Sequence, residues 1–170
     1  MLCMIGAASI TATTTATGSS LEAGAAEPVR FEHVDLFADS GTEGLGAYQV
    51  EVIAEVPGGS GKVVLVGVEG GDASASEGKG VAFAAPPVYD PEALSRDRIV
   101  IAAYTSLGAE RLPTGRVRVA RLHVQIESAR EPGDDQPMVK PTYRVRVIAA
   151  GRADGTRMPA AFDVVPGGSK

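Results

Sequence analysis

Residues 45–56, LGAYQVEVIAEV, carry the clearest structural signal in the chain. From Tyr48 to Val56 an apolar side chain stands at every second position, and mostly polar side chains stand between them. Because successive side chains of a strand point to opposite faces of its sheet, this period of two predicts a strand with one buried face. The predicted inward residues are Tyr48, Val50, Val52, Ala54 and Val56. Ile53 is the one apolar residue on the outward side.

Similar runs of β-branched residues, separated by turns, fill the chain from residue 29 onward. The other predicted strands are 29–37, 62–69, 81–85, 98–105, 115–127, 142–150 and 157–165. The chain has 21 Gly and 11 Pro, as a fold with many turns requires. The nearly uniform apolar run at 62–69 predicts a central strand or a very hydrophobic sandwich strand. Together these runs predict an all-β fold, an antiparallel β-sandwich of eight or nine strands, in one domain spanning residues 27–170.

Two irregularities are also predicted. In 115–127, Val117 and Val119 have the opposite parity to the apolar residues that follow Arg121, so we expect a one-residue β-bulge around Ala120–Arg121. The segment 89–96 predicts a single helical turn, with Asp90 as its cap and a proline at the first helical position.

Composition limits the classes of function. The 170-residue chain is 44% hydrophobic and 22% charged, with a formal net charge of −5, so its electrostatics do not favour nucleic-acid binding. The domain contains no apolar run of about 18 residues, the length that a membrane-spanning helix needs. We therefore expect no membrane span in the mature chain.

The N-terminal residues 1–26 differ from the rest. They are apolar and small, then rich in Thr, Ser, Ala and Gly, with an Ala-x-Ala spacing at Ala23 and Ala25. This composition predicts a signal peptide or a disordered leader, and hence a secreted or cell-envelope protein, although a basic n-region is missing. Cys3 is the only cysteine, which excludes disulfides and cysteine-based metal sites within the chain.

The order of these segments resembles cohesin-like domains and the related carbohydrate-binding β-sandwiches of secreted bacterial proteins. The resemblance rests on YQVEV at 48–52, YDP at 89–91, and GRV at 115–117 leading into ARLHV at 120–124. It covers roughly residues 29–150, with YDP placed later than in typical cohesins. It implies a nine-stranded jelly roll that binds partner proteins through one sheet face.

Few residues suit catalysis or cofactor binding. His33 and His123 are the only histidines and lie on separate predicted strands, so we expect neither a metal site nor a cofactor. No serine has a Gly-x-Ser-x-Gly context, and no carboxylate pair is placed across a cleft, so we do not expect an enzyme. Asp35, Asp39 and Glu43 are consistent with solvated turn residues or, less simply, with calcium ligands.

The arginines are the strongest candidates for a binding surface. They lie on the polar sides of the strands 115–127 and 142–150, and pairing of these two strands as a hairpin across 128–141 would align them in one basic stripe. The predicted partner-binding residues are Arg116, Arg118, Arg121, His123, Arg144 and Arg146. The pattern is consistent with a solvent face stabilised by salt bridges, or with a docking surface for an acidic or anionic partner.

The function expected from the sequence is an exported, non-catalytic binding or assembly module of cohesin-like type that engages a protein partner. The alternative is a carbohydrate-binding module, whose ligand would be a polysaccharide. Such modules stack aromatic rings on sugars, but this chain has no tryptophan. Tyr48 and Tyr143 have inward parity, which leaves Tyr89 and Tyr104 as the candidates for sugar stacking.

Overall fold

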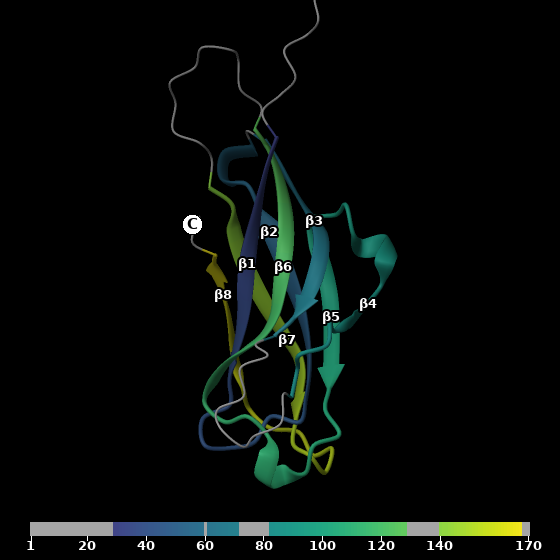
Figure 1. The fold of residues 1–170 in the computed structure, drawn as a ribbon. Coiled ribbons are helices and arrows are strands. Elements are labelled where there is room, and N and C mark those ends of the chain that lie inside the picture. The colour runs from purple at the N-terminus through teal and green to yellow at the C-terminus, as the bar shows by residue number, and fades with distance from the viewer. Residues whose placement is uncertain (1–28, 60, 72–81, 129–139, 168–170) are drawn as a thin grey trace, which may run out of the picture.

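The computed structural model describes residues 29–59, 61–71, 82–128 and 140–167, which form two four-stranded sheets packed face to face (Figure 1). The strands are β1 (Val29–Asp39), β2 (Ala47–Glu55), β3 (Gly61–Gly70), β4 (Val88–Tyr89), β5 (Arg98–Tyr104), β6 (Arg116–Ser128), β7 (Thr142–Gly151) and β8 (Ala161–Pro166). Short 3-10 turns occupy Pro57–Gly59, Pro91–Ala93 and Ala109–Arg111. The predictions for residues 1–26 and for most of the 70–80 and 128–141 loops lie outside the described residues.

Both sheets are antiparallel. One has the strand order β3-β6-β1-β8 and is called the β1 sheet; the other has the order β4-β5-β2-β7 and is called the β2 sheet. The pairings β1–β8, β2–β7, β3–β6 and β4–β5 are nested along the chain. The predicted all-β sandwich is confirmed, whereas the jelly-roll and cohesin-like assignments stay predictions.

Among the residues that the structure describes, none forms a helix with the length and hydrophobicity that a membrane span requires.

The core lies between the sheets and follows the alternation of β2. Tyr48, Val50, Val52 and Ala54 are buried, and they meet residues such as Leu36 from the β1 sheet. Burial of each large aliphatic side chain contributes about 1.5–3 kcal/mol relative to exposure. The inward parity predicted for residues 45–56 is therefore correct.

The predicted bulge in β6 is present one residue before the expected position. Leu36 of β1 pairs with Ala120 and the next residue of β1 pairs with Arg118, so Val119 has no cross-strand partner. Val119 is buried, and its carbonyl accepts a hydrogen bond of 3.0 Å from the Tyr48 hydroxyl of the opposite sheet. This bond satisfies a buried acceptor at the bulge.

The turn after β4 also follows the sequence. Asp90 Oδ1 accepts a hydrogen bond of 3.0 Å from the Glu92 amide at the start of the Pro91–Ala93 turn, so the predicted cap is confirmed.

The chain after this turn contacts the free edge of β3 at Leu65. The Leu65 amide donates to the Arg96 carbonyl over 2.8 Å, and the Leu65 carbonyl accepts from the Ser95 amide over 2.7 Å.

Two strand predictions need correction. β3 is an edge strand rather than a central one, which leaves the alternative of a very hydrophobic sandwich strand, and Val63, Val64 and Leu65 are all buried. Residues 82–85 of the predicted strand 81–85 form a turn, in which the Phe83 carbonyl accepts from the Gly71 amide over 2.7 Å. The Phe83 ring nevertheless joins the core, with its centroid 5.3 Å from that of Tyr48.

Candidate binding surface

The predicted basic stripe does not form, because β6 and β7 do not pair. β6 lies between β1 and β3, whereas β7 pairs with β2 in the other sheet, and Figure 1 shows the two strands in different layers. Arg116, Arg118, Arg121 and His123 therefore belong to one sheet, and Arg144 and Arg146 to the other. The hairpin expectation was wrong, since a sandwich allows consecutive strands to change sheets.

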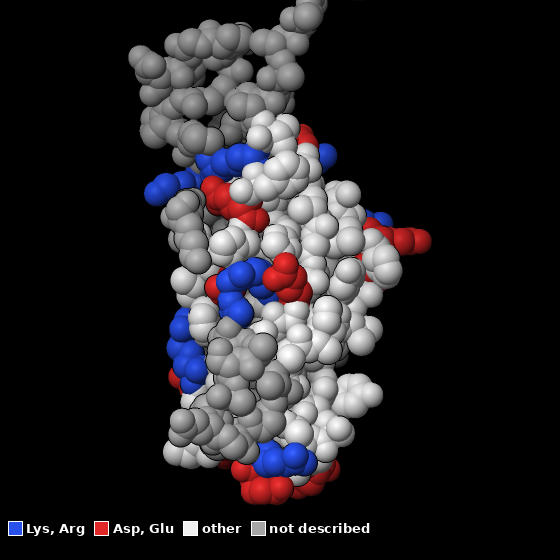
Figure 2. Space-filling view, in the orientation of Figure 1, with Lys and Arg blue, Asp and Glu red and all other residues white. Residues whose placement is uncertain are grey.

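On the β1 sheet, each of the four predicted site residues has an acidic partner. The side chain of Arg121 donates to both oxygens of Asp35, with distances of 2.8 and 3.2 Å, and Arg118 Nη1 lies 3.4 Å from the same carboxylate. Arg116 Nη2 lies 2.7 Å from Asp163 Oδ2, and His123 Nε2 lies 2.8 Å from Glu69 Oε1. Figure 2 shows basic and acidic side chains against one another on this face. This half of the predicted site therefore has each basic side chain next to an acidic one, and its role in partner binding stays a prediction.

Asp35 illustrates the electrostatics of this face. Burial by itself raises the pKa of the Asp35 carboxyl, but the hydrogen bond and charge of Arg121, helped by the charges of Arg118 and His33, outweigh burial. The pKa therefore lies below its ordinary value of 3.8. Asp35 is held as an arginine counterion, which leaves it poorly suited to bind calcium.

The remaining metal candidates have other roles. Asp39 Oδ1 accepts a hydrogen bond of 2.9 Å from the Gly41 amide in a turn, and Glu43 forms an ion pair with Arg152. His33 and His123 are direct cross-strand neighbours, a proximity that the sequence did not reveal. Across the residues that the structure describes, no group of three or more His, Cys, Asp and Glu is placed to hold a metal ion.

The outer face of the β2 sheet has a charged half that the sequence revealed only in part. Arg146 Nε donates to Glu51 Oε2 over 2.8 Å, and Arg144 Nη2 forms an ion pair with Glu55. Arg98 of β5, absent from the predicted site, has Nη1 at 3.6 Å from Glu51 Oε1. Glu51 is only 9% exposed, whereas the three arginine side chains are 60–68% exposed. We call Arg98, Arg144 and Arg146 the arginine cluster.

The other half of this face is apolar. A groove of about 400 Å³ has small side chains along β5, β2 and β7 around Gln49, and Val88 and Tyr104 are 72% and 79% exposed beside it. The small residues are Ala47, Ala102, Ala149 and Gly151. Val100, also exposed, faces Glu51 in the ladder and so joins the groove to the arginine cluster. We call the groove with Val88, Val100 and Tyr104 the apolar patch.

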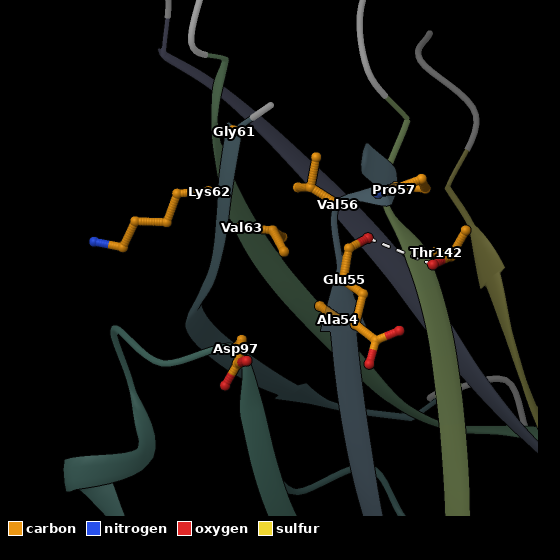
Figure 3. Close-up of a pocket in the computed structure, with 9 residues that line it drawn as sticks. All are labelled: Ala54, Glu55, Val56, Pro57, Gly61, Lys62, Val63, Asp97 and Thr142. Carbon is orange, nitrogen blue, oxygen red and sulfur yellow. Dashed lines mark hydrogen bonds between the residues drawn. The ribbon is translucent and has the colours of Figure 1, made fainter. Parts of the chain in front are cut away.

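A second hollow of about 500 Å³ lies where β2, β3, β7 and the start of β5 come together (Figure 3). Lys62 points away from it, and the Thr142 hydroxyl donates to the Glu55 carbonyl over 3.4 Å at its side. Its acidic side chains are Glu55, which already pairs with Arg144, and Asp97. Its described lining residues include no histidine, cysteine or serine.

The tyrosines separate into different roles. Tyr48 is buried, while Tyr143 and Tyr89 are partly buried and pack against the core, which weakens Tyr89 as a sugar platform. Tyr104 alone among the four has a largely exposed ring. Sequence reasoning missed Arg98 and Val88 as surface residues. The outward parity of Arg98 in the run 98–105 was a usable signal, whereas the two-residue strand of Val88 gave none.

Comparisons with protein-family models, with curated proteins and with solved structures found no match for this chain.

Proposed function

We propose that the protein is a non-catalytic binding module that engages a protein partner through the outer face of the β2 sheet. The observation that carries the proposal is the continuity of the apolar patch with the arginine cluster on this one face. Arginine and aromatic residues are enriched in protein interfaces. The cohesin-like resemblance and the leader-like composition of residues 1–26 support an exported module of the same class.

The apolar patch is unusual for a solvent-facing sheet surface. Antiparallel sheets with one face in water place polar residues on that face, and exposed apolar groups that lie together commonly mark interaction sites. Here Val88 and Tyr104 are more than two-thirds exposed beside a groove lined largely by small residues. A partner side chain can enter such a groove because no large side chain fills it. The arginines at its border would then lie at the rim of the interface.

The test compares two exposed aromatic residues on opposite faces. Tyr104 borders the groove, whereas Phe31, 69% exposed, lies on β1. The full chain and its Tyr104→Glu and Phe31→Glu variants serve as bait for envelope and secreted fractions. Any protein recovered is then purified, and its dissociation constant is measured against all three chains.

We expect Tyr104→Glu to weaken binding of the purified partner about tenfold or more, as loss of a central contact does, and Phe31→Glu to change it less than about twofold. Equal weakening by both variants, or weakening by Phe31→Glu alone, would reject this face as the interface. Circular dichroism of each variant shows that the fold is retained.

A carbohydrate-binding module is the second candidate, and the exposed Tyr104 ring beside Gln49 is the observation that favours it. A sugar stacked on Tyr104 requires the ring but neither its hydroxyl nor the arginines. Polysaccharide binding would then survive Tyr104→Phe and the Arg144→Ala/Arg146→Ala double substitution, and would be lost in Tyr104→Ala. Recovery of polysaccharide with this pattern, and of no protein, would favour the second candidate over the first.

A further inference from the structure

We infer that Arg98, Arg144 and Arg146 form a carboxylate-binding site for an acidic segment of the partner, with Glu51 as the residue that positions two of them. This inference rests on the proposed function, since it uses the same face, and it adds the chemistry of the partner.

The strand register gathers the three arginines around one residue. Ile53 of β2 is paired with Arg98 of β5 on one side and with Arg144 of β7 on the other. Arg146 lies two residues further along β7 on the same outward face, opposite Glu51. Diagonal neighbours across a ladder are about 7–8 Å apart, within reach of long side chains. Three guanidinium groups that are far apart in sequence therefore lie over one small area of sheet.

The arginine cluster carries more positive charge than its own carboxylates neutralise. Three arginines share two carboxylates, Glu51 and Glu55, which leaves one positive charge in excess among these five groups. Each guanidinium has five N–H donors, many more than two carboxylates can accept. Arg98 forms an ion pair with Glu51, but the distance of 3.6 Å from Arg98 Nη1 to Glu51 Oε1 is longer than a hydrogen bond. Donors on this face therefore remain available to a further anion.

Glu51 differs from an ordinary surface counterion because its side chain is nearly buried between two arginines. It accepts from Arg146 on one side and attracts Arg98 on the other. A buried carboxylate that holds two arginines reduces the side-chain entropy that they lose when a ligand binds. This arrangement presents two pre-positioned guanidinium groups, which bind carboxylates in bidentate geometry.

The charge and the surroundings favour an acidic peptide over a larger polyanion. A chain with a net charge of −5 repels nucleic acid and highly charged polysaccharide, whereas one excess charge suits one or two carboxylates. Val100 and the groove lie directly beside the arginine cluster. The occupant expected is therefore a segment with acidic residues next to an apolar side chain.

The test uses a fluorescein-labelled peptide of alternating glutamate and phenylalanine, with a glutamine-for-glutamate peptide as its control, in fluorescence anisotropy with the full chain. We expect the Arg144→Ala/Arg146→Ala variant to bind the acidic peptide about tenfold more weakly, because it removes two of the three guanidinium groups that would contact the carboxylates of the peptide. The matched variant, Arg111→Ala/Arg116→Ala, removes the same charge outside this face and should change binding less than twofold. An equal loss of peptide affinity in both double variants would show that net charge alone explains the binding, and would overturn the inference.

Glu51→Gln gives the sharper result, because it removes one negative charge and so makes the net charge of the face more positive by one. If the arginines act only through their positive charge, this variant binds the acidic peptide more tightly. If Glu51 positions the arginines, the variant binds the peptide about threefold or more weakly, and its affinity depends less on salt concentration. Tighter binding would overturn the positioning role. Should Glu51→Gln fail to fold, Arg98→Ala tests the same arrangement, with weaker binding expected and unchanged binding contradicting the inference.

Two further outcomes separate this inference from the proposed function. If the acidic peptide binds neither the wild-type protein nor any variant, but partner capture still depends on Tyr104, the inferred carboxylate-binding site is wrong. The proposed interface is then retained. If oligogalacturonate binds more tightly than the acidic peptide and loses affinity in the Arg144→Ala/Arg146→Ala variant, the occupant is a polysaccharide and the acidic-peptide inference falls.

Discussion

Arg146 and Glu51 face each other across β7 and β2, and Arg146 Nε donates to Glu51 Oε2 over 2.8 Å. The Glu51 side chain is only 9% exposed, so the carboxylate that accepts this hydrogen bond is largely shielded from water. The ion pair of Arg144 with Glu55 on the same strands has both side chains at least half exposed. The two pairs have the same chemistry in different surroundings, and their contributions to stability should differ accordingly.

We expect Arg146→Ala to lower the free energy of unfolding by about 1–3 kcal/mol, because it removes the hydrogen bond of a buried carboxylate. Arg144→Ala should cost less than about 0.5 kcal/mol, as exposed pairs do. Urea unfolding of the two variants in low salt measures the difference. Equal losses would show that Glu51 is better solvated than its burial indicates.

Tyr48→Phe should lower the free energy of unfolding by about 1–2 kcal/mol. The substitution keeps the ring contacts with Phe83 and Phe162 but removes the hydroxyl that binds the Val119 carbonyl at the bulge, leaving a buried acceptor unsatisfied. Tyr104→Phe is the control, because its ring is 79% exposed. Thermal unfolding compares the two, and a loss of the same size in Tyr104→Phe would contradict the role of the bulge hydrogen bond.

For Tyr143 we expect removal of the hydroxyl not to lower the free energy of unfolding, and we expect its ionisation to make stability depend on pH. Its hydroxyl is buried and has no hydrogen-bond partner among the described residues, so Tyr143→Phe should be neutral or slightly stabilising at pH 7. Burial, with a smaller effect from the charge of Glu32, raises the pKa of Tyr143 from 10.0 to about 12. The unfolded chain then loses this proton first, and stability falls as pH rises from about 10 towards 12.

The measurement for Tyr143 is the free energy of unfolding at pH 8 and at pH 11. We expect it to drop less between these values in Tyr143→Phe than in the wild-type protein. An identical drop in both proteins would show that Tyr143 ionises as easily in the folded chain as in the unfolded one.

Asp35 should make stability sensitive to acid. Because its pKa is lowered in the folded protein, the ionised carboxylate contributes stability that is present above its ordinary pKa of 3.8 and is lost as pH falls through the lower folded value. Between pH 5 and pH 2, Asp35→Asn should therefore lose less stability than the wild-type protein. Arg121→Ala should flatten the same acid limb, since Arg121 is the main partner of Asp35. Acid curves that coincide in all three proteins would contradict this assignment.

Much of the fold was predictable because its signals are local. The period-two pattern of residues 45–56, the parity change in 115–127 and the Asp90 cap depend on neighbours a few residues apart, and the structure places each within a residue of its predicted position. The candidate site was less predictable. Arg144 and Arg146 were recognised as outward residues of one strand, but Arg98 and Val88 join them only through the pairing of β7, β2, β5 and β4.

The sequence by itself determined that this chain forms strands, which side of most strands is buried, and that Arg144 and Arg146 face water. The tertiary structure alone decided which strands are neighbours: it separated β6 from β7, made β3 an edge strand and placed Glu51 between Arg98 and Arg146. The physical reason is that alternation is set by each strand's own pleat, whereas pairing depends on contacts between residues far apart in the chain and on the packing of two whole sheets.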